Sequence, residues 1–187
     1  MLGGDRFVLY PAITYPHKRH DVLLDAFALV AARHPRLRLV LTGGAAASES
    51  AVQTRIRRPD LDGRVLRTGR VPAAQLESLF AAAALVAVPS DYEGFGLPVL
   101  EAMVRGVPVV AAAAGSLPEV ARPEDLVPAE DVAAWAAAIE AVLAESTDAR
   151  NARIAGGRER AAQFGPERTA AALLTAYRRA AAARVPT

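Results

Sequence analysis

The chain has 187 residues, 52% of them hydrophobic, so it is long enough to bury a sizeable core within a single domain. It contains no cysteine, which excludes disulfide bonds, thiolate zinc sites and cysteine nucleophiles. Its 22 basic and 20 acidic residues leave a net charge of +2, which does not predict a nucleic-acid partner.

Short apolar runs alternate with segments of helical spacing through the first 120 residues. Strands are predicted over residues 6–10, 37–41, 64–67, 85–88 and 107–111. Helices are predicted from residue 21, over residues 48–58 and 73–83, from Pro98 to Gly106, and in a short turn after Ser116. This alternation predicts an α/β fold, a Rossmann-like parallel sheet with helices on both faces, within one domain spanning residues 1–187.

The last third of the chain is predicted to be mainly helical. Helices are expected over residues 131–144, 148–164 and 166–183, whereas residues 122–128 leave the last strand of the sheet undecided. Trp135, Ile139 and Leu143 share one face of the first of these helices. The final helix carries an apolar stripe formed by Ala170, Leu173, Leu174 and Tyr177.

Residues 84–120 carry the strongest functional signal. Backbone N–H groups of Phe95, Gly96 and Leu97 are expected at a helix N-terminus, where unpaired donors and the helix dipole favour an anion. Gly94 and Gly96 would let the backbone approach that anion closely.

Two carboxylates flank this turn. Glu93 and Glu101 would remain free to accept hydrogen bonds from sugar hydroxyls on either side of a bound diphosphate. The alternative is that Glu101 caps or pairs on its helix and that Glu93 is a solvated turn acid. The glycines, Pro98 and the strand context together favour the ligand interpretation.

The loop after the first strand is the second candidate region. Lys18 could reach a phosphate as a mobile point charge, assisted by Arg19 or the histidines, because ligands of such sheets bind at the carboxyl ends of the strands. A solvated basic loop is the alternative.

Two motifs give a family resemblance. E-G-F-G-L-P-V-L-E, from Glu93 to Glu101, resembles the E-x7-E signature of retaining glycosyltransferases with the GT-B fold, particularly family 4 (glycosyltransferases group 1). The residues 108–120 that follow are similar to that family's next strand and loop, and residues 16–18 are similar to its P-H-K-N form. The similarity runs from about residue 7 to residue 177, and it covers only the C-terminal, donor-binding half of such an enzyme.

The resemblance implies how a donor would be held. Lys18, the 95–97 amides and Arg19 would stabilise the leaving diphosphate. Glu93 would contact the transferred sugar, as a positioning group and not as a nucleophile, and Glu101 would hold the ribose hydroxyls. Many family members place an arginine where this chain has Ile13, so one phosphate-stabilising charge is missing, which bears on turnover more than on binding.

Two further strand ends are expected to line the same pocket. Gly43 would allow a ligand to approach the backbone after the second strand. Arg70 and Val71 lie in a loop that resembles the family loop facing the nucleobase. A plain turn and a surface arginine are the alternatives at these positions. His17, His20 and His34 show no metal-ligand spacing, so neither a metal site nor any other cofactor is expected.

The resemblance predicts the donor-binding domain of a retaining hexosyltransferase, which transfers a sugar from a nucleotide-diphosphate sugar to an unknown acceptor. An N-terminal GT-B domain, in the parent chain or in a partner subunit, would complete the cleft, cover the final helix and supply any peripheral membrane association. This chain alone is expected to bind donor but transfer little.

Three other expectations accompany this one. The alternative function is a non-catalytic nucleotide-sugar-binding or regulatory subunit that complements a partner chain. An epimerase or phosphorylase fragment of GT-B type fits the E-x7-E context less well. Without a secretory signal or an apolar run of roughly 18–20 residues, the protein is expected to be cytoplasmic.

Overall fold

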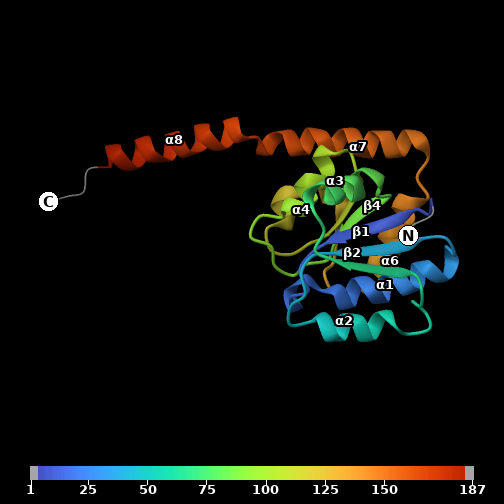
Figure 1. The fold of residues 1–187 in the computed structure, drawn as a ribbon. Helices are drawn as coiled ribbons and strands as arrows, with labels where there is room; N and C mark the ends of the chain where they lie inside the picture. The colour runs from blue at the N-terminus through green and yellow to red at the C-terminus, as the bar shows by residue number, and fades with distance from the viewer. Residues whose placement is uncertain (1–3, 184–187) are drawn as a thin grey trace.

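The structure, a computed structural model, describes residues 4–183 and contains a six-stranded sheet (Figure 1). The strand order is β3-β2-β1-β4-β5-β6, and each neighbouring pair is parallel. The strands are β1 (Phe7–Pro11), β2 (Arg38–Thr42), β3 (Val65–Gly69), β4 (Leu85–Val88), β5 (Val109–Ala112) and β6 (Leu126–Val127). The predicted Rossmann-like parallel sheet is therefore confirmed.

Helices cover both faces of this sheet (Figure 1), with α1, α2 and α6 on one face and α3, α4 and α7 on the other. The helices are α1 (His20–Arg33), α2 (Glu49–Ile56), α3 (Ala73–Ala82), α4 (Leu97–Val104), α5 (Leu117–Val120), α6 (Val132–Leu143), α7 (Thr147–Ala161) and α8 (Pro166–Ala182). Short 3-10 turns occupy Pro16–Lys18, Pro123–Asp125 and Ala162–Phe164.

The core lies between the sheet and these two helical layers. All four residues of β4 are buried, as are residues 7–10 of β1, because each strand has helices on both sides. The predicted apolar face of α6 is confirmed, since Trp135, Ile139 and Leu143 are all buried. Asp131 caps this helix by accepting a hydrogen bond from the backbone N–H of Ala134.

The edge containing β5 and β6 differs from the sequence prediction. The strand expected from residue 107 begins at Val109, because Pro108 has no N–H with which to join the ladder. The carbonyl of Pro108 still accepts a hydrogen bond from the N–H of Val86. The strand left undecided by the sequence is β6, which pairs with β5.

The final helix, α8, projects beyond the body of the domain (Figure 1). None of its residues is buried, and its large apolar side chains Leu173, Leu174 and Tyr177 are 49%, 54% and 68% exposed. The predicted apolar stripe is therefore present and open to solvent. Within residues 4–183, no helix combines the length and hydrophobicity that a membrane span requires.

Candidate functional site

The sheet changes direction of winding between β1 and β4. From β1 the chain continues through α1 into the neighbouring β2, and it later returns from β3 to place β4 on the other side of β1. The loops that follow β1 and β4 therefore diverge and leave a crevice at the carboxyl ends of these strands, where ligands of such sheets bind. An open hollow of about 570 Å³ lies there, and we call it the switch-point hollow.

Most of the predicted site residues line this hollow. They come from the loop after β1, the loop after β4 and the first turns of α4. The residues concerned are Lys18, Glu93, Gly94, Phe95, Gly96, Leu97 and Glu101. Segments 75 residues apart in the chain are thus brought to one place, as the sequence predicted.

An ion pair between Lys18 and Glu93 joins the two loops. The Lys18 Nζ atom lies 2.7 Å from Glu93 Oε1, and the two side chains are 18% and 10% exposed. Lys18 ends a 3-10 turn, and Arg19 beyond it adopts a left-handed conformation (φ 47°, ψ 45°) that starts α1. The ammonium group of Lys18 is therefore held at the mouth of the crevice, where it is paired with the Glu93 carboxylate.

Two buried hydroxyls lie directly behind this ion pair. The Tyr10 hydroxyl donates to the Lys18 carbonyl at 2.7 Å and lies 2.9 Å from Ser90 Oγ. The Ser90 hydroxyl in turn donates to Glu93 Oε1 at 2.7 Å. Burial raises the pKa of Tyr10 and keeps its phenol protonated.

Sequence reasoning did not select Tyr10 or Ser90. Tyr10 falls at the end of the strand predicted over residues 6–10, and Ser90 lies two residues beyond the strand predicted over residues 85–88. The available signal was chemical, because a tyrosine in a buried strand needs a partner for its hydroxyl.

The N-terminus of α4 forms one wall of the hollow. Gly96 has φ +92°, and a Cβ atom there would lie 2.9 Å from Leu117 Cδ2, so a side chain is excluded by both backbone angle and space. Within residues 4–183, the N–H groups of Phe95, Gly96 and Leu97 donate to no protein acceptor. Such unpaired donors at a helix N-terminus favour an anion.

Arg19 does not line the switch-point hollow. Its guanidinium contacts the carboxylates of Asp21, Asp91 and Glu130. The hydrogen bond with Asp21 is the largest influence raising the pKa of Arg19, and the bond with Asp91 adds to it. Ile13 does line the hollow, so a neutral side chain occupies the position at which the family resemblance implied an arginine. Lys18 is then the one lysine or arginine among the residues that line it.

The other predicted residues lie at the same edge of the sheet but outside this hollow. Gly43 follows β2 with φ +126°, and a Cβ atom there would lie 2.3 Å from the carbonyl oxygen of Ala12. Arg70 folds back over Gly44, and Val71 is half-buried beyond it. The close backbone approach expected at Gly43 is present, and its partner is the loop after β1.

Arg67 holds this glycine pair in place, although sequence reasoning assigned it only to a strand. Its guanidinium donates to the carbonyls of Gly43 and Gly44 and to Glu49 Oε2, at 2.8, 3.2 and 2.9 Å. The side chain is almost fully buried, and these bonds replace the hydration lost by its two terminal nitrogens, whereas its Nε has no acceptor among the described residues.

His20 is a further buried polar group at this edge. It is 3% exposed and packs against the Tyr10 ring, with 4.9 Å between ring centroids. Burial, followed by the positive charge of Arg67, lowers the pKa of His20 to about 4. The imidazole is therefore neutral at physiological pH.

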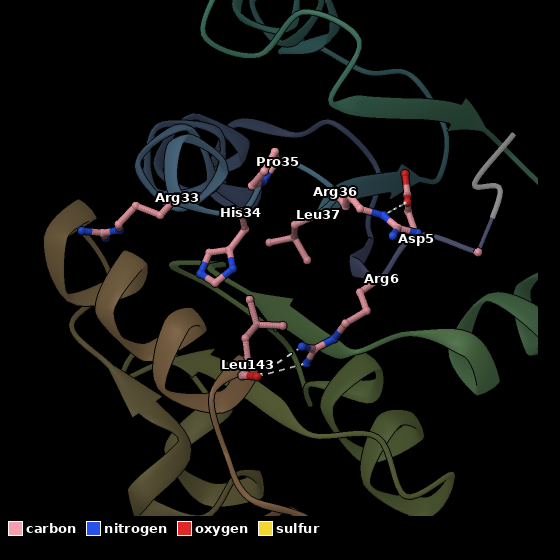
Figure 2. A pocket seen from close by; sticks show the side chains of 9 residues that line it. Asp5, Arg6, Arg33, His34, Pro35, Arg36, Leu37 and Leu143 are labelled. Carbon is pink, nitrogen blue, oxygen red and sulfur yellow. Dashed lines mark hydrogen bonds and ion pairs between the residues drawn. The ribbon is translucent and has the colours of Figure 1, made fainter.

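A second hollow lies at the opposite edge of the sheet, where the strands begin (Figure 2). Several basic residues line it, and each of its three arginines contacts a protein acceptor. Arg6 donates to the carbonyl of Leu143 through both terminal nitrogens, and Arg36 pairs with Asp5 (Figure 2). Arg33 pairs with Glu140. The guanidinium of Arg6 thus caps the C-terminal end of α6, which is a structural role.

Metal binding has no visible basis in the part of the chain that the structure describes. Between residues 4 and 183, no three side chains of the His, Cys, Asp or Glu type are grouped so that they could hold a metal ion. The absence of a metal in the reaction stays a prediction.

Comparison with known proteins gives a consistent result. A family model described as glycosyl transferases group 1 matches residues 2–160. D-inositol 3-phosphate glycosyltransferase from Mycobacterium marinum is 36% identical over 184 residues, which are 94% of this chain and 39% of that protein. The chain therefore spans about two fifths of the length of this relative.

Two solved structures show the same arrangement of strands and helices. Sucrose-phosphate synthase from Thermosynechococcus elongatus matches with a TM-score of 0.80 and 33% identity, over 96% of this chain and 46% of that one. Anabaena Alr3699/HepE, solved in complex with UDP-glucose, matches with a TM-score of 0.75 and 28% identity, over 87% of this chain and 45% of that one.

Proposed function

The chain belongs to the glycosyl transferases group 1 family and has the fold of the C-terminal half of a GT-B glycosyltransferase, and on this basis we propose that it binds the nucleotide-sugar donor of a retaining, family 4 type hexosyltransferase. The observation that carries the proposal is the meeting of Lys18, Glu93 and the unpaired N–H groups of α4 at the switch point. The HepE complex with UDP-glucose supports a donor of this class.

The geometry suggests a division of labour within the hollow. The diphosphate would accept hydrogen bonds from the 95–97 amides and draw Lys18 away from Glu93, because a phosphate is a stronger partner for an ammonium group than one carboxylate. Glu93 would then be free to accept a hydroxyl of the transferred sugar. Glu101, which lines the hollow further along α4, would hold the ribose.

Catalysis would consist mainly of stabilising the departing diphosphate. The negative charge that develops on the leaving oxygen would meet Lys18 and the N-terminal dipole of α4, both already in position. No metal ion or other cofactor would be needed. Arg19, whose guanidinium lies among three carboxylates, would contribute only if donor binding released it.

A second domain would supply the acceptor site. The relatives are more than twice as long as this chain, and the open stripe of Leu173, Leu174 and Tyr177 on α8 is a surface on which such a domain could pack. Transfer, acceptor choice, peripheral membrane association and a cytoplasmic location are therefore proposals about the assembled enzyme.

Calorimetric titration tests donor binding directly. The chain should bind at least one of UDP-glucose, GDP-glucose and ADP-glucose, and Lys18→Ala should weaken that binding at least tenfold, since a charge-assisted hydrogen bond contributes about 1.5–3 kcal/mol. Glu101→Gln should weaken the binding of the nucleotide diphosphate and of the nucleotide sugar by the same factor. Absence of binding to all of these nucleotides would contradict the proposal.

The alternative is a nucleotide-sugar-binding subunit without catalytic activity. The observation that favours it is Ile13, which leaves Lys18 as the one lysine or arginine lining the hollow beside two glutamates. The two functions are distinguished by measuring hydrolysis of the nucleotide sugar after the chain has been combined with the N-terminal half of a relative. Binding without any release of nucleotide diphosphate, unchanged in Ile13→Arg, would support the alternative.

A further inference from the structure

Two buried hydroxyls connect the lysine and the glutamate of the switch-point hollow. We propose that Tyr10 and Ser90 are positioning residues for donor binding, with Tyr10 fixing Lys18 and Ser90 fixing Glu93. The inference rests on the proposed function and deepens it. It concerns residues that touch the binding groups from behind and do not themselves line the hollow.

The hydrogen atoms of this chain of contacts can be counted. The Lys18 carbonyl can only accept, so the single proton of the Tyr10 phenol is used there. The Tyr10 oxygen must then accept from Ser90 if the 2.9 Å contact between them is a hydrogen bond. Ser90 also has one proton, and the Glu93 carboxylate accepts it at 2.7 Å. The Ser90 proton therefore serves either Tyr10 or Glu93 at any moment.

This count gives Ser90 a definite task. In the structure, Glu93 Oε1 accepts hydrogen bonds from two directions, from Lys18 Nζ and from Ser90 Oγ, at 2.7 Å each. When a diphosphate draws the ammonium group of Lys18 away, Ser90 is the remaining contact that keeps the carboxylate facing the sugar. If Ser90 turns its proton toward Tyr10, Glu93 is released. The serine thus controls how rigidly Glu93 is presented to a bound sugar.

Tyr10 acts on the other partner. Its hydroxyl donates to the backbone carbonyl of Lys18, next to the left-handed Arg19 at the start of α1. A non-glycine residue with positive φ is held only where its surroundings determine the conformation. The tyrosine hydroxyl is one of those determinants, so its loss should loosen the turn that aims Lys18.

The two roles predict different losses for donors with and without a sugar. Ser90→Ala should weaken UDP-glucose binding about tenfold while changing UDP binding less than about twofold, because Glu93 faces the sugar. Tyr10→Phe should weaken UDP and UDP-glucose by the same factor, about three- to tenfold, because Lys18 faces the diphosphate. If the chain prefers another base, the corresponding GDP or ADP pair serves as the probe.

Thr42→Val is the matched control. Thr42 is also buried at a strand end of this edge, and its hydroxyl donates to the Gly69 carbonyl at 3.0 Å, but it contacts neither Lys18 nor Glu93. The change replaces a buried hydroxyl by a methyl group and keeps the size of the side chain. It should lower the free energy of unfolding without altering the affinity for either nucleotide.

The experiment is calorimetric titration of the full chain and its variants, with Glu93→Ala as a second background, because alanine removes the acceptor of the Ser90 hydroxyl. Ser90→Ala should have no further effect on UDP-glucose binding once Glu93→Ala is present. Equal losses for UDP and UDP-glucose in Ser90→Ala, or similar losses in Thr42→Val, would show a merely structural role and overturn the inference. A wild-type chain that binds no nucleotide would overturn the proposed function, and this inference with it.

Discussion

The two edges of the sheet carry similar side chains and use them differently. Where the strands begin, arginines donate to carbonyls at helix C-terminal ends, as Arg6 does to Leu143 and Arg64 does to His34. Where the strands end, Lys18 meets a glutamate beside the unpaired amides of α4. The direction of the parallel strands decides this difference, because it places helix C-termini at one edge and N-termini at the other.

The comparison teaches how to distinguish a binding site from a hollow. The hollow in Figure 2 is lined by arginines that donate to a backbone carbonyl at a helix C-terminal end or to partly buried acids. In the switch-point hollow, the N–H groups at the start of α4 have no acceptor among residues 4–183. Unpaired backbone donors at a helix N-terminus, more than the number of charges, favour the switch-point hollow as the candidate anion site.

The largest effect is expected from Gly43→Ala. The substitution forces a side chain into φ +126° and places its Cβ 2.3 Å from the Ala12 carbonyl, which should lower the free energy of unfolding by about 3–5 kcal/mol. Gly63→Ala is the control, because Gly63 has φ +64° but nothing within 4 Å. It should lower stability by about 1 kcal/mol. Equal losses of the free energy of unfolding in the two variants, measured by urea unfolding, would mean that the edge where the strands end is not closely packed at Gly43.

A dependence of stability on pH should arise from His20. The unfolded chain binds a proton on this residue near pH 6.5, whereas the folded chain does so only near pH 4. The free energy of unfolding should therefore fall, by at most about 3 kcal/mol, as the pH drops from 6.5 to 4.

Urea unfolding across this pH range measures the effect. His20→Gln should flatten the dependence of the free energy of unfolding on pH. If the free energy of unfolding of His20→Gln depended on pH as steeply as that of the unaltered chain, the account of a neutral, buried His20 would be contradicted.

Substitutions at the two edges should have opposite signatures. Arg6→Ala removes the cap on α6 and should cost about 1–2 kcal/mol of stability while changing nucleotide affinity less than twofold. Lys18→Met keeps most of the apolar stem and should weaken UDP binding at least tenfold. Unfolding curves and titrations on both variants test this, and a loss of affinity in Arg6→Ala would break the comparison.

The smallest effect belongs to α8, which takes part in neither edge. Leu174→Ser should change the free energy of unfolding of this chain by less than about 0.5 kcal/mol, because the side chain is 54% exposed. Leu39→Ser, in the buried middle of β2, is the contrasting variant and should be severely destabilised. A large loss in Leu174→Ser would show that α8 packs on the domain.

The sequence predicted most of the fold because its signals are local. Each strand is a short apolar run and each helix has its own periodicity, so the alternation was readable without tertiary information. Pro108 moves the start of β5 to Val109, and the two-residue strand β6 is too short to give a recognisable sequence pattern. Pairing with β5, a tertiary effect, defines it.

Sequence reasoning named residues that line the switch-point hollow and missed the buried residues around them. Lys18, Glu93 and the α4 amides belong to motifs, and the topology brings them together. Tyr10, Ser90 and Arg67 act through contacts with residues far away in the chain, which no local pattern encodes. Arg19 shows the converse, because its position in the motif did not reveal that carboxylates from two other loops would surround it.

Amide chemical shifts of the isotope-labelled chain, recorded during a titration with UDP, test the central claim most directly. The account predicts that the backbone signals of Lys18, Phe95, Gly96 and Leu97 shift together and saturate at one dissociation constant. It also predicts that the signals of Arg6, His34 and Arg36 at the opposite edge stay in place. Largest shifts at those three residues, or no shifts at any UDP concentration that saturates a relative, would contradict it.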